Sequence, residues 1–592
     1  MGTFATIFTA LLVRPLCLFV CIASAAQNFV VPWSNTQYGP DGPWQAVKIT
    51  VGGNDSSLTI GVQNHADVDV LPGGAFGSMI ISTNACQPYP NTSCGAGGVW
   101  DPVLASSPGI SFQPFLVDPS YGLEAVGETE IIQAITINQQ SIWNVSIVSA
   151  TIANITNPDG TVRGVPLGNL ALGADAQTQV FSLSSSIPNE AVVSWIFPGA
   201  LYNQSITPSY SYGLHIGSAQ FNYPGSLVFG GFNKGRVIGP VTMFSDTPPQ
   251  LLDIGIGVEE GGSPFNFTSK QGLLISNTSQ VGPMTVSPDP LTPYLSLTDQ
   301  TCKAITGLLP VTFDIKSKYY LWNTNDPKYK AIISSPAYLS FTFPPAPGDS
   351  ANVTIKVPFA LLNLTLESPI VSTPAQYFPC RAFTPGSGDN LRLGRAFLQA
   401  AFLGRNWNAH TSWLAQAPGP GVGKNGLGDF NTDIQDHDLT LDTFNNASLF
   451  AQSWAMYWTV IGQANATGIT PTAVSTSSQS SKPSSGLSTG AEVGIGIGVA
   501  AAALTALGLL IFWWRSRRSR KSIEMNTTVP MQQPEWGHTG QPLSLSYDLN
   551  GSKQQPASPP SPQELRADLP VQELRADLPV QEMPDPNDPR HR

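Results

Sequence analysis

Residues 225–233 read GSLVFGGFN, a short apolar run bounded on both sides by glycine. Runs of this kind recur from residue 28 to about residue 420, and many alternate apolar with polar residues. They include WQAVKITV, SLTIGV, GSMIIS, TEIIQAITI, LLDIGIGV, ITGLLPVTFDI, AYLSFTF and NVTIKVPFALLNLTL. Clusters of Gly, Pro and Asn separate the runs, and no helical period is sustained over three turns before residue 490. Short strands between turn residues are typical of an all-β fold.

Charge is scarce and mostly acidic. Charged residues form 11% of the 592 residues, and the net charge is −11. Residues 27–492 hold 29 acidic and 17 basic side chains, so the excess lies in this middle segment. We expect no nucleic-acid partner, because such a protein presents a basic face. The six histidines lack the spacing of metal ligands, so we expect no metal site and no cofactor.

Address signals lie near both ends of the chain. Residues 1–26 contain an apolar run that ends in small residues, which indicates a cleaved signal peptide. Residues 493–514 carry no charge and are long enough to span a bilayer core of about 30 Å. A cluster of Arg and Lys over residues 515–521 follows at once and predicts a cytoplasmic C-terminal side. The prediction is a single-pass type I protein of the cell membrane, with the membrane as a partner and the ectodomain outside the cell.

Two segments flank this predicted span. Residues 421–492 are expected to form a linker and stalk, because 466–490 are rich in Ser, Thr and Pro and cannot bury a core. Residues 515–592 are expected to be a disordered cytoplasmic tail. The tail repeats QELRADLPV at 563–571 and 572–580, and two copies are too few for a solenoid. We expect the tail to present docking motifs, and the sequence does not name its partners.

The middle segment suits an oxidising, glycosylating compartment. Cys17 and Cys21 leave with the signal peptide, so four cysteines remain, with two expected disulfides and three connectivities open. Eleven N-x-S/T acceptor sites support a glycosylated surface. Their asparagines are Asn54, Asn91, Asn144, Asn154, Asn203, Asn266, Asn277, Asn352, Asn363, Asn446 and Asn465.

A larger constellation points to a family. YGLHIGS at 212–218 precedes GSLVFGGFN, LLDIGIGV follows at 251–258, and RLGRAFLQAAFLGRNWNAHTSWLAQA at 392–417 closes the β region. In this order and spacing, the segments resemble the pepsin-type aspartic peptidases, most of all their fungal membrane-anchored relatives. The resemblance covers about residues 38–420. It implies a bilobal β fold with an N-lobe of about 38–235 and a C-lobe of about 236–420; an unrelated β-sandwich is the alternative.

The catalytic loops depart from the family pattern. In that family each lobe supplies one Asp from a D-T/S-G-T/S loop, and the two carboxyls share one proton. The first loop here reads Leu71-Pro72-Gly73-Gly74, with Leu71 expected at the Asp position. The second loop, residues 289–292, keeps the carboxylate of Asp289 and a hydroxyl at Thr292, but Leu291 replaces the Gly and should crowd the approach of the loops. We expect no catalytic dyad.

Further roles follow from the resemblance. Tyr121 in SYGLEAVGE is the candidate tyrosine of the flap over the cleft. Asp69 is the candidate substitute for the missing Asp, but it lies about 6.6 Å along a strand from residue 71 and would need a bulge. The resemblance also implies disulfides Cys86–Cys94 and Cys302–Cys380.

These patterns predict a type I membrane glycoprotein whose aspartic-peptidase-like ectodomain is catalytically inactive. It would act as a cell-surface binding, sensor or wall-associated protein, with a peptide or polysaccharide segment in the cleft between the lobes. One alternative is an active membrane-anchored aspartic-type endopeptidase, which a carboxylate pair in the cleft would favour. The other is a purely structural wall glycoprotein, which a filled cleft would favour.

Protease added to intact cells tests the predicted topology. Because the Arg and Lys cluster predicts an internal tail, the glycosylated mass should be lost while an epitope in residues 515–592 stays protected. Immunoblots before and after permeabilisation measure this. Digestion of the tail epitope in intact cells would refute the orientation.

Overall fold

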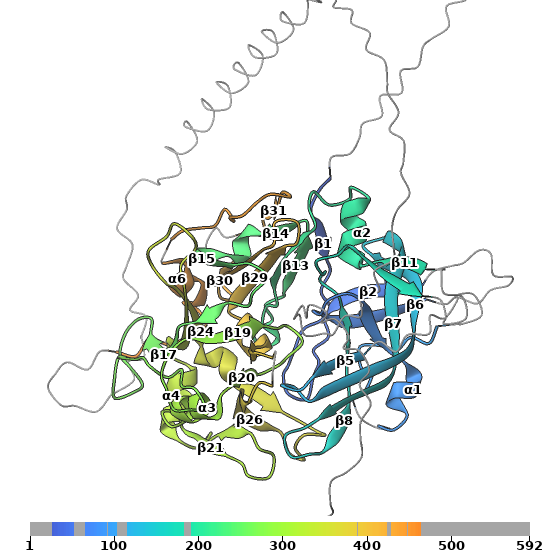
Figure 1. Ribbon diagram of the computed structural model, residues 1–592. Coiled ribbons are helices and arrows are strands. Elements are labelled where there is room, and N and C mark those ends of the chain that lie inside the picture. Colours follow the sequence, from blue (N-terminus) through green and yellow to red (C-terminus); the bar gives the residue numbers. More distant parts are fainter. Residues whose placement is uncertain are drawn as a thin grey trace, which may run out of the picture. The chain divides into compact units, whose positions relative to one another are not determined.

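The computed structural model describes residues 26–52, 65–90, 93–102, 115–182, 191–386, 389–422, 428–446 and 448–462 (Figure 1). The predicted signal peptide up to residue 25, the predicted span 493–514 and the predicted tail 515–592 lie outside these residues. Within the described ranges no helix is long and apolar enough to cross a membrane. Most of the described elements are strands, and their helices have three to eight residues, which confirms the all-β prediction.

The first half of the chain builds a ten-stranded sheet. Its strands follow the order β10-β11-β7-β4-β9-β3-β2-β6-β5, and β8 pairs with β7 outside this path. Short helices α1 (Thr83–Cys86) and α2 (Phe197–Asn203) accompany the sheet. The strands are β2 (Val47–Val51), β3 (Ala66–Pro72), β4 (Ser78–Ile81), β5 (Phe115–Asp118), β6 (Leu123–Ile137), β7 (Gln140–Thr156), β8 (Val162–Gly164), β9 (Gly168–Leu170), β10 (Thr178–Ser182) and β11 (Ala191–Trp195).

The second half builds three smaller sheets. Five strands follow the order β16-β19-β28-β20-β27, and two sheets of four follow β18-β17-β23-β24 and β21-β22-β26-β25. The strands are β16 (Gln250–Leu251), β17 (Asp253–Val258), β18 (Ser269–Lys270), β19 (Met284–Pro288), β20 (Leu295–Leu297), β21 (Val311–Phe313), β22 (Tyr320–Trp322), β23 (Ala337–Phe343), β24 (Val353–Pro358), β25 (Leu364–Leu366), β26 (Ala375–Phe378), β27 (Cys380–Ala382) and β28 (Leu391–Leu393). The helices are α3 (Asp299–Thr306), α4 (Pro327–Ile333), η4 (Phe359–Leu362) and α5 (Arg395–Leu398).

A six-stranded sheet takes strands from both halves and joins them. Its order is β1-β13-β12-β29-β30-β15, so strands from residues 29–31 and from the last part of the domain share one hydrogen-bonded ladder. The strands are β1 (Phe29–Val31), β12 (Ser211–His215), β13 (Ser226–Phe229), β15 (Ile238–Phe244), β29 (Ala401–Asn406) and β30 (Thr411–Gln416), and the 3₁₀ turns η2 (Ala219–Phe221) and η3 (Lys234–Arg236) lie between them in sequence. Two β-rich halves joined by a shared sheet agree with the expected bilobal arrangement.

The stretch GSLVFGGFN forms two strands rather than one. Gly230 lies between β13 and β14 (Gly231–Asn233) and has φ +67°, a conformation that glycine adopts without strain. A Cβ at this position would lie 2.5 Å from the Cβ of Thr207. Glycine is therefore required where the chain leaves the six-stranded sheet.

The domain extends beyond the predicted boundary at residue 420. Strand β31 (Asn431–Asp433) pairs with β14, and helix α6 (Leu449–Trp454) buries Phe450 and Trp454 to 4% and 2% exposure. The ring of Trp454 packs against Phe221, with centroids 5.5 Å apart. The prediction that the linker begins at residue 421 is therefore wrong, because apolar side chains within 428–462 belong to the core. The Ser/Thr-rich part of the predicted stalk lies outside the described residues.

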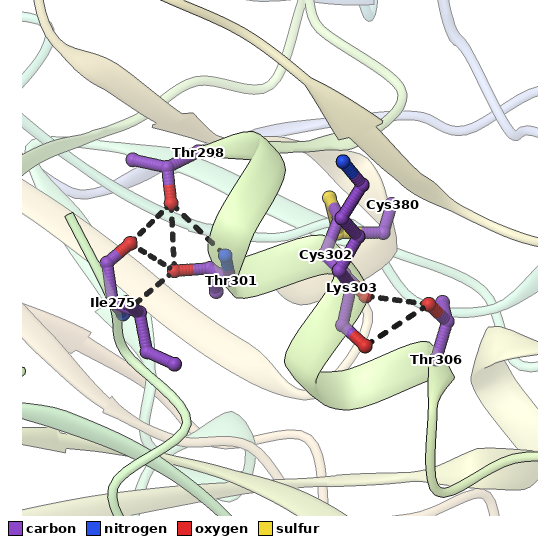
Figure 2. The surroundings of a disulfide bond; sticks show 7 residues. All are labelled: Ile275, Thr298, Thr301, Cys302, Lys303, Thr306 and Cys380. Carbon is purple, nitrogen blue, oxygen red and sulfur yellow. Dashed lines mark hydrogen bonds between the residues drawn. A yellow bond between two sulfur atoms is a disulfide. The ribbon is translucent and has the colours of Figure 1, made fainter. Parts of the chain in front are cut away.

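Both predicted disulfides are confirmed. Cys86 pairs with Cys94, and Cys302 in α3 pairs with Cys380 at the start of β27. Figure 2 shows how the second bridge and its surroundings fix α3: Thr298 caps the helix at the backbone N–H of Thr301, and both hydroxyls donate to the carbonyl of Ile275. The bridge therefore connects a capped, well-held helix to the sheet that carries the Asp289 loop.

Most of the described glycosylation acceptors are accessible. Their attachment to glycans stays a prediction. Asn154 and Asn363 are half-buried, whereas Asn54, Asn91 and Asn465 lie outside the described residues. The exposed asparagines are Asn144, Asn203, Asn266, Asn277, Asn352 and Asn446.

Removing the two disulfides separately should have unequal effects. The bridges close sequence separations of 8 and 78 residues. Because the entropy lost by the unfolded chain grows with loop length, the Cys302→Ser/Cys380→Ser variant should lose about 2 kcal/mol more unfolding free energy than Cys86→Ser/Cys94→Ser. Denaturant titration of the two variants measures this difference. Equal losses would contradict the loop-closure argument.

Candidate functional site

The two halves build corresponding loops from the same strand arrangement. In the first half β9 lies between β4 and β3, and in the second half β28 lies between β19 and β20. In each case the strand entering the loop runs parallel to the middle strand, and the strand leaving it runs antiparallel. The loops therefore occupy equivalent places in the two halves, and their residues can be compared position by position.

Strand pairing shows that Gly73 occupies the position in the first loop that Asp289 occupies in the second. Pro72 pairs with Leu170, and the next residue, Gly73, donates its N–H to the Leu170 carbonyl at 2.9 Å. Pro288 pairs with Leu393 in the same way, and Asp289 donates its N–H to the Leu393 carbonyl at 3.0 Å. Gly73 therefore holds the position that corresponds to Asp289.

The prediction for Leu71 is wrong by two residues. Leu71 lies inside β3 opposite Asn169, and it corresponds to Ser287 rather than to Asp289. The alternation in ADVDVLP does not fix the register of the loop, which depends on pairing with a strand about 100 residues later. The corrected position, Gly73, still offers no carboxylate.

Leu291 fills the space that Gly73 leaves. A Cβ on Gly73 would lie 2.8 Å from both Cγ and Cδ2 of Leu291, and the Leu291 side chain is 9% exposed. The expected crowding by Leu291 is thus present as a tight contact between the two loops. A larger side chain at residue 73 could enter only if Leu291 moved.

Asp69 is held elsewhere. Its Oδ2 accepts hydrogen bonds from the hydroxyls of Ser34 and Tyr38. It therefore ties β3 to the segment before β2. The structure does not bring this predicted substitute to Asp289.

A different carboxylate, Asp118, reaches the Asp289 loop. The Thr292 hydroxyl lies 2.7 Å from Asp118 Oδ2 and 2.9 Å from Asp289 Oδ2. Asp118 is 7% exposed and Thr292 is fully buried. We call these three residues the carboxyl bridge. The sequence analysis did not single out Asp118. This residue begins the turn signal DPSYG, which also contains Tyr121.

Asp118 also shapes the turn between β5 and β6. Its Oδ1 accepts from the Ser120 hydroxyl at 2.6 Å and from the backbone N–H groups of Ser120 and Tyr121 at 2.9 and 3.3 Å. Gly122 donates its N–H to the Asp118 carbonyl at 2.7 Å and has φ +76°. One oxygen of Asp118 therefore organises the turn, and the other fixes the turn to the second half of the chain.

The electrostatics of Asp289 reflect these neighbours. Burial raises the pKa of Asp289, the Asp118 carboxylate raises it further, and the Arg392 guanidinium opposes the rise. Arg392 Nη1 lies 3.7 Å from Asp289 Oδ2, while its Nη2 lies 2.9 Å from Asp389. The Leu291 N–H donates to Asp289 Oδ1 at 2.9 Å. Asp289 is thus a partly shielded carboxyl that keeps its proton to a higher pH than an exposed aspartate does.

Tyr121 lies on the expected turn, but its side chain is buried in a polar network between the halves. Its hydroxyl donates to Asp41 Oδ2 at 3.1 Å and accepts from Arg163 Nη2 at 3.0 Å. Its ring meets that of Tyr294 edge-on, 5.8 Å between centroids. Burial raises the pKa of Tyr121, so the hydroxyl remains a donor. Arg381 holds the Tyr121 carbonyl from the other side at 2.8 Å.

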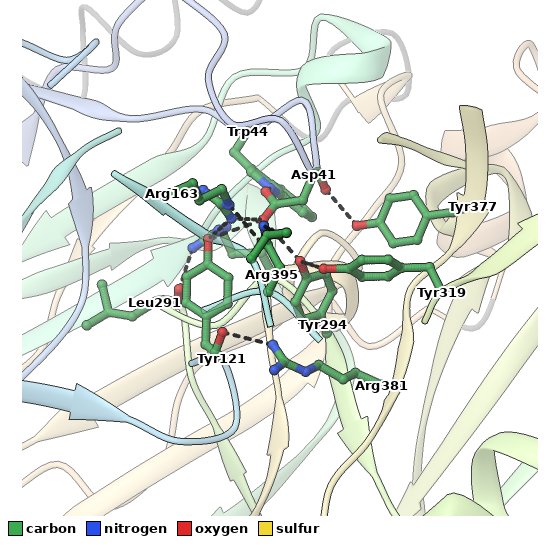
Figure 3. Close-up of polar contacts among 12 residues, drawn as sticks. Asp41, Trp44, Tyr121, Arg163, Leu291, Tyr294, Tyr319, Tyr377, Arg381 and Arg395 are labelled. Carbon is green, nitrogen blue, oxygen red and sulfur yellow. Dashed lines mark hydrogen bonds and ion pairs between the residues drawn. The ribbon is translucent and has the colours of Figure 1, made fainter. Parts of the chain in front are cut away.

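Asp41 is the centre of this network. Its carboxylate pairs with Arg163 at 2.9 Å, and the two side chains are 1% and 2% exposed. Trp44 donates its indole N–H to Oδ1 at 2.8 Å, and Tyr294 donates to Oδ2 at 3.2 Å. Figure 3 shows Asp41 between Arg163 and the side chain of Tyr377, whose hydroxyl donates to the Asp41 carbonyl at 2.7 Å. Groups from both halves thus saturate one buried carboxylate.

The same network reaches the Asp289 loop. The Arg395 guanidinium lies 4.8 Å from the Trp44 ring and donates to the carbonyls of Pro290 and Leu291 at 3.0 and 2.7 Å. A cavity of about 40 Å³ remains beneath the turn, with Leu71, Tyr121 and Leu291 in its lining. At about 10–15 Å³ a molecule, this volume holds a few waters.

One exposed group of side chains has the composition of a metal site. Potential ligand atoms of Asp175, Asp246 and His410 lie within 4.8 Å of one another. Arg405 Nη2 lies 2.6 Å from Asp246 and 3.6 Å from Asp175. The guanidinium therefore already supplies the positive charge between these carboxylates.

Comparisons with known proteins give one kind of match. No protein-family model matches the sequence, and no curated protein matches it. Solved structures do match; one is an aspartic proteinase from Irpex lacteus, with 15% sequence identity and a TM-score of 0.41. That alignment covers 66% of this chain and 97% of the other.

Removing one member of the buried ion pair should be costly. Arg163→Met leaves the Asp41 carboxylate buried without its cation, so the unfolding free energy should fall by about 3–5 kcal/mol. The Arg163→Met/Asp41→Asn variant should lose less than the sum of the two single changes. Urea titrations measure both. The exposed pair Lys303–Asp299 provides the control: Lys303→Met should change stability little. Additive effects at residues 41 and 163 would show that the two charges are not coupled.

Proposed function

We propose that residues 38–462 form a catalytically silent, aspartic-peptidase-like domain of a type I membrane glycoprotein with a binding, sensor or wall-associated role at the cell surface. The order of the motifs from residue 212 to residue 417 supports the relationship to aspartic peptidases. The corresponding loops that begin at Gly73 and Asp289 support it further, because each half repeats one strand–loop–strand unit. The signal peptide, the span and the stalk supply the proposed location, and they rest on the sequence.

The observation that carries the silent assignment is the contact between Gly73 and Leu291. Peptide hydrolysis by this class needs two carboxyls that share a proton and activate a water between them. The position equivalent to Asp289 has no side chain, and Leu291 covers it. A single carboxyl at Asp289 cannot act as both the base and the acid in one step.

An active endopeptidase is the second candidate, and the carboxyl bridge is the observation in its favour. Asp118 provides a second carboxylate near Asp289, from the turn rather than from the first loop. The Thr292 hydroxyl, however, stands between the two carboxyls, at contact distance from each. The two carboxyls therefore meet through this hydroxyl, whereas a working dyad shares its proton directly and holds a water between its carboxyls. This arrangement favours the silent reading.

The resting state also limits what can enter between the halves. Tyr121 and Asp118 both bind groups of the second half or of the Asp41 network. A peptide or polysaccharide segment would have to separate these contacts before it could occupy the space under the turn. The filled space equally suits a purely structural glycoprotein, and the two roles differ in whether a ligand can lift the turn.

Peptide hydrolysis is the direct test of the proposed silence. The purified full chain, incubated with a mixed peptide library, should cleave at background rates from about pH 2 to pH 7, a range that encloses both pKa values of a working dyad. Gly73→Asp should not create activity, because Leu291 occupies the space of its Cβ. Mass spectrometry of the library detects cleavage.

The control separates a contaminating peptidase from this chain. Asp289→Asn should leave the background unchanged. Cleavage that is blocked by a tetrahedral-intermediate mimic and lost in both Asp289→Asn and Asp118→Asn would establish the active alternative.

A further inference from the structure

We propose that Asp118 and Asp289 share a single proton through the Thr292 hydroxyl, and that this proton holds the turn Asp118–Gly122 down on the second half of the chain. When Asp289 loses this proton, the turn is released. The carboxyl bridge is then a pH-dependent latch. This inference concerns the proton and the turn, and it does not depend on whether the protein binds a ligand or cleaves peptides.

The Thr292 hydroxyl has one hydrogen but lies near two carboxylate oxygens. A threonine hydroxyl carries one hydrogen and can donate to one acceptor at a time. Its oxygen nevertheless lies 2.7 Å from Asp118 Oδ2 and 2.9 Å from Asp289 Oδ2. Both contacts are hydrogen bonds only if one carboxyl is protonated and donates to the Thr292 oxygen. The geometry therefore calls for one proton on the pair.

The guanidinium groups near the carboxyl bridge are partly engaged by other acceptors. In the described part of the chain, Arg392 supplies the guanidinium that contacts Asp289, and Asp389 shares it: Arg392 lies 2.9 Å from Asp389 and 3.7 Å from Asp289. Arg395 Nη1 faces this loop and donates hydrogen bonds to two backbone carbonyls. Among the described residues, the charged and titratable groups that face the pair or its turn are Asp389 and Arg392 from the β28 side, Arg395 from α5, Arg381 from β27, Tyr121 within the turn itself, and Asp41, Arg163 and Tyr294, which contact Tyr121.

The sign of the pH effect follows from this inventory. Burial and Asp118 raise the pKa of Asp289, with Arg392 opposing, so the folded state binds the proton more tightly than the unfolded chain does. Such a group stabilises the closed turn fully at acid pH. The stabilisation is lost as the pH rises through the raised pKa, above the ordinary aspartate value of about 4. The latch is closed in acid and loosens toward neutral pH.

Release would have a defined structural consequence. Asp118 Oδ1 also accepts the N–H groups of Ser120 and Tyr121, so movement of Asp118 disturbs the whole turn. Tyr121 lies in the same turn and lines the cavity beneath it. Opening the turn would therefore expose Tyr121 and the apolar lining beneath it.

Hydrogen exchange of the turn amides tests the latch in the full chain. After correction for intrinsic exchange, the peptide covering residues 118–126 should lose protection as the pH rises from about 4 to 8, by up to about tenfold per pH unit through the transition. In Asp289→Asn the profile should be flat and protected, because an amide N–H₂ can donate to Thr292 at any pH. Thr292→Val should weaken protection at every pH.

The control is an aspartate of the same sheet that takes no part in the bridge. Asp67 in β3 accepts from Thr50, and Asp67→Asn should keep the wild-type pH profile of the turn. A flat profile in the wild-type protein would overturn the proposal. The same would follow if Asp289→Asn kept the wild-type pH dependence, because the proton would then belong to another group.

Discussion

The buried Asp41 carboxylate is the constraint on which the arrangement of the two halves depends. A charge that is 1% exposed is tolerable only when it is paired and fully hydrogen-bonded. Arg163, Tyr121 and Trp44 from the first half meet this need together with Tyr294 from the second. If the halves separated, this carboxylate would therefore lose the hydrogen bond that the second half supplies. The shared six-stranded sheet joins the halves at the backbone, and Asp41 joins them at the side chains.

The Asp289 loop inherits its shape from this core. Trp44 packs under Arg395, and Arg395 holds the carbonyls of Pro290 and Leu291. This fixes Leu291 over Gly73 and leaves Asp289 and Thr292 facing the turn at Asp118. The replacements at the two loops are complementary: a glycine stands where a carboxylate would be, and a leucine stands where a glycine would be. Their joint effect is an apolar contact at the place where catalysis of this class needs a shared proton and a water.

Features set by local pattern were predictable from the sequence, and features set by distant partners were not. The alternation of VTIKVP at 353–358 predicts a half-buried strand, and it forms β24 with alternating burial. The Cys pairing followed from the family resemblance. The register of the first loop, in contrast, depends on β9, and the predicted position moved from Leu71 to Gly73. Asp41 and Arg163 are 122 residues apart, and Asp118 and Thr292 are 174 apart, so no local signal could have paired them. The boundary at residue 420 failed because scattered aromatic residues such as Trp454 join the core without a strand or helix period.

The central claim is that no dyad able to stabilise a tetrahedral intermediate exists at Asp289. Isothermal titration calorimetry of the full chain with a peptide that carries a statine-like hydroxyl in place of the scissile bond tests it most directly, from about pH 3 to pH 7. The account predicts no saturable binding that depends on Asp289, because Gly73 supplies no second carboxylate and Leu291 covers its position. Saturable binding that is present in the wild-type protein and lost in Asp289→Asn would contradict the account.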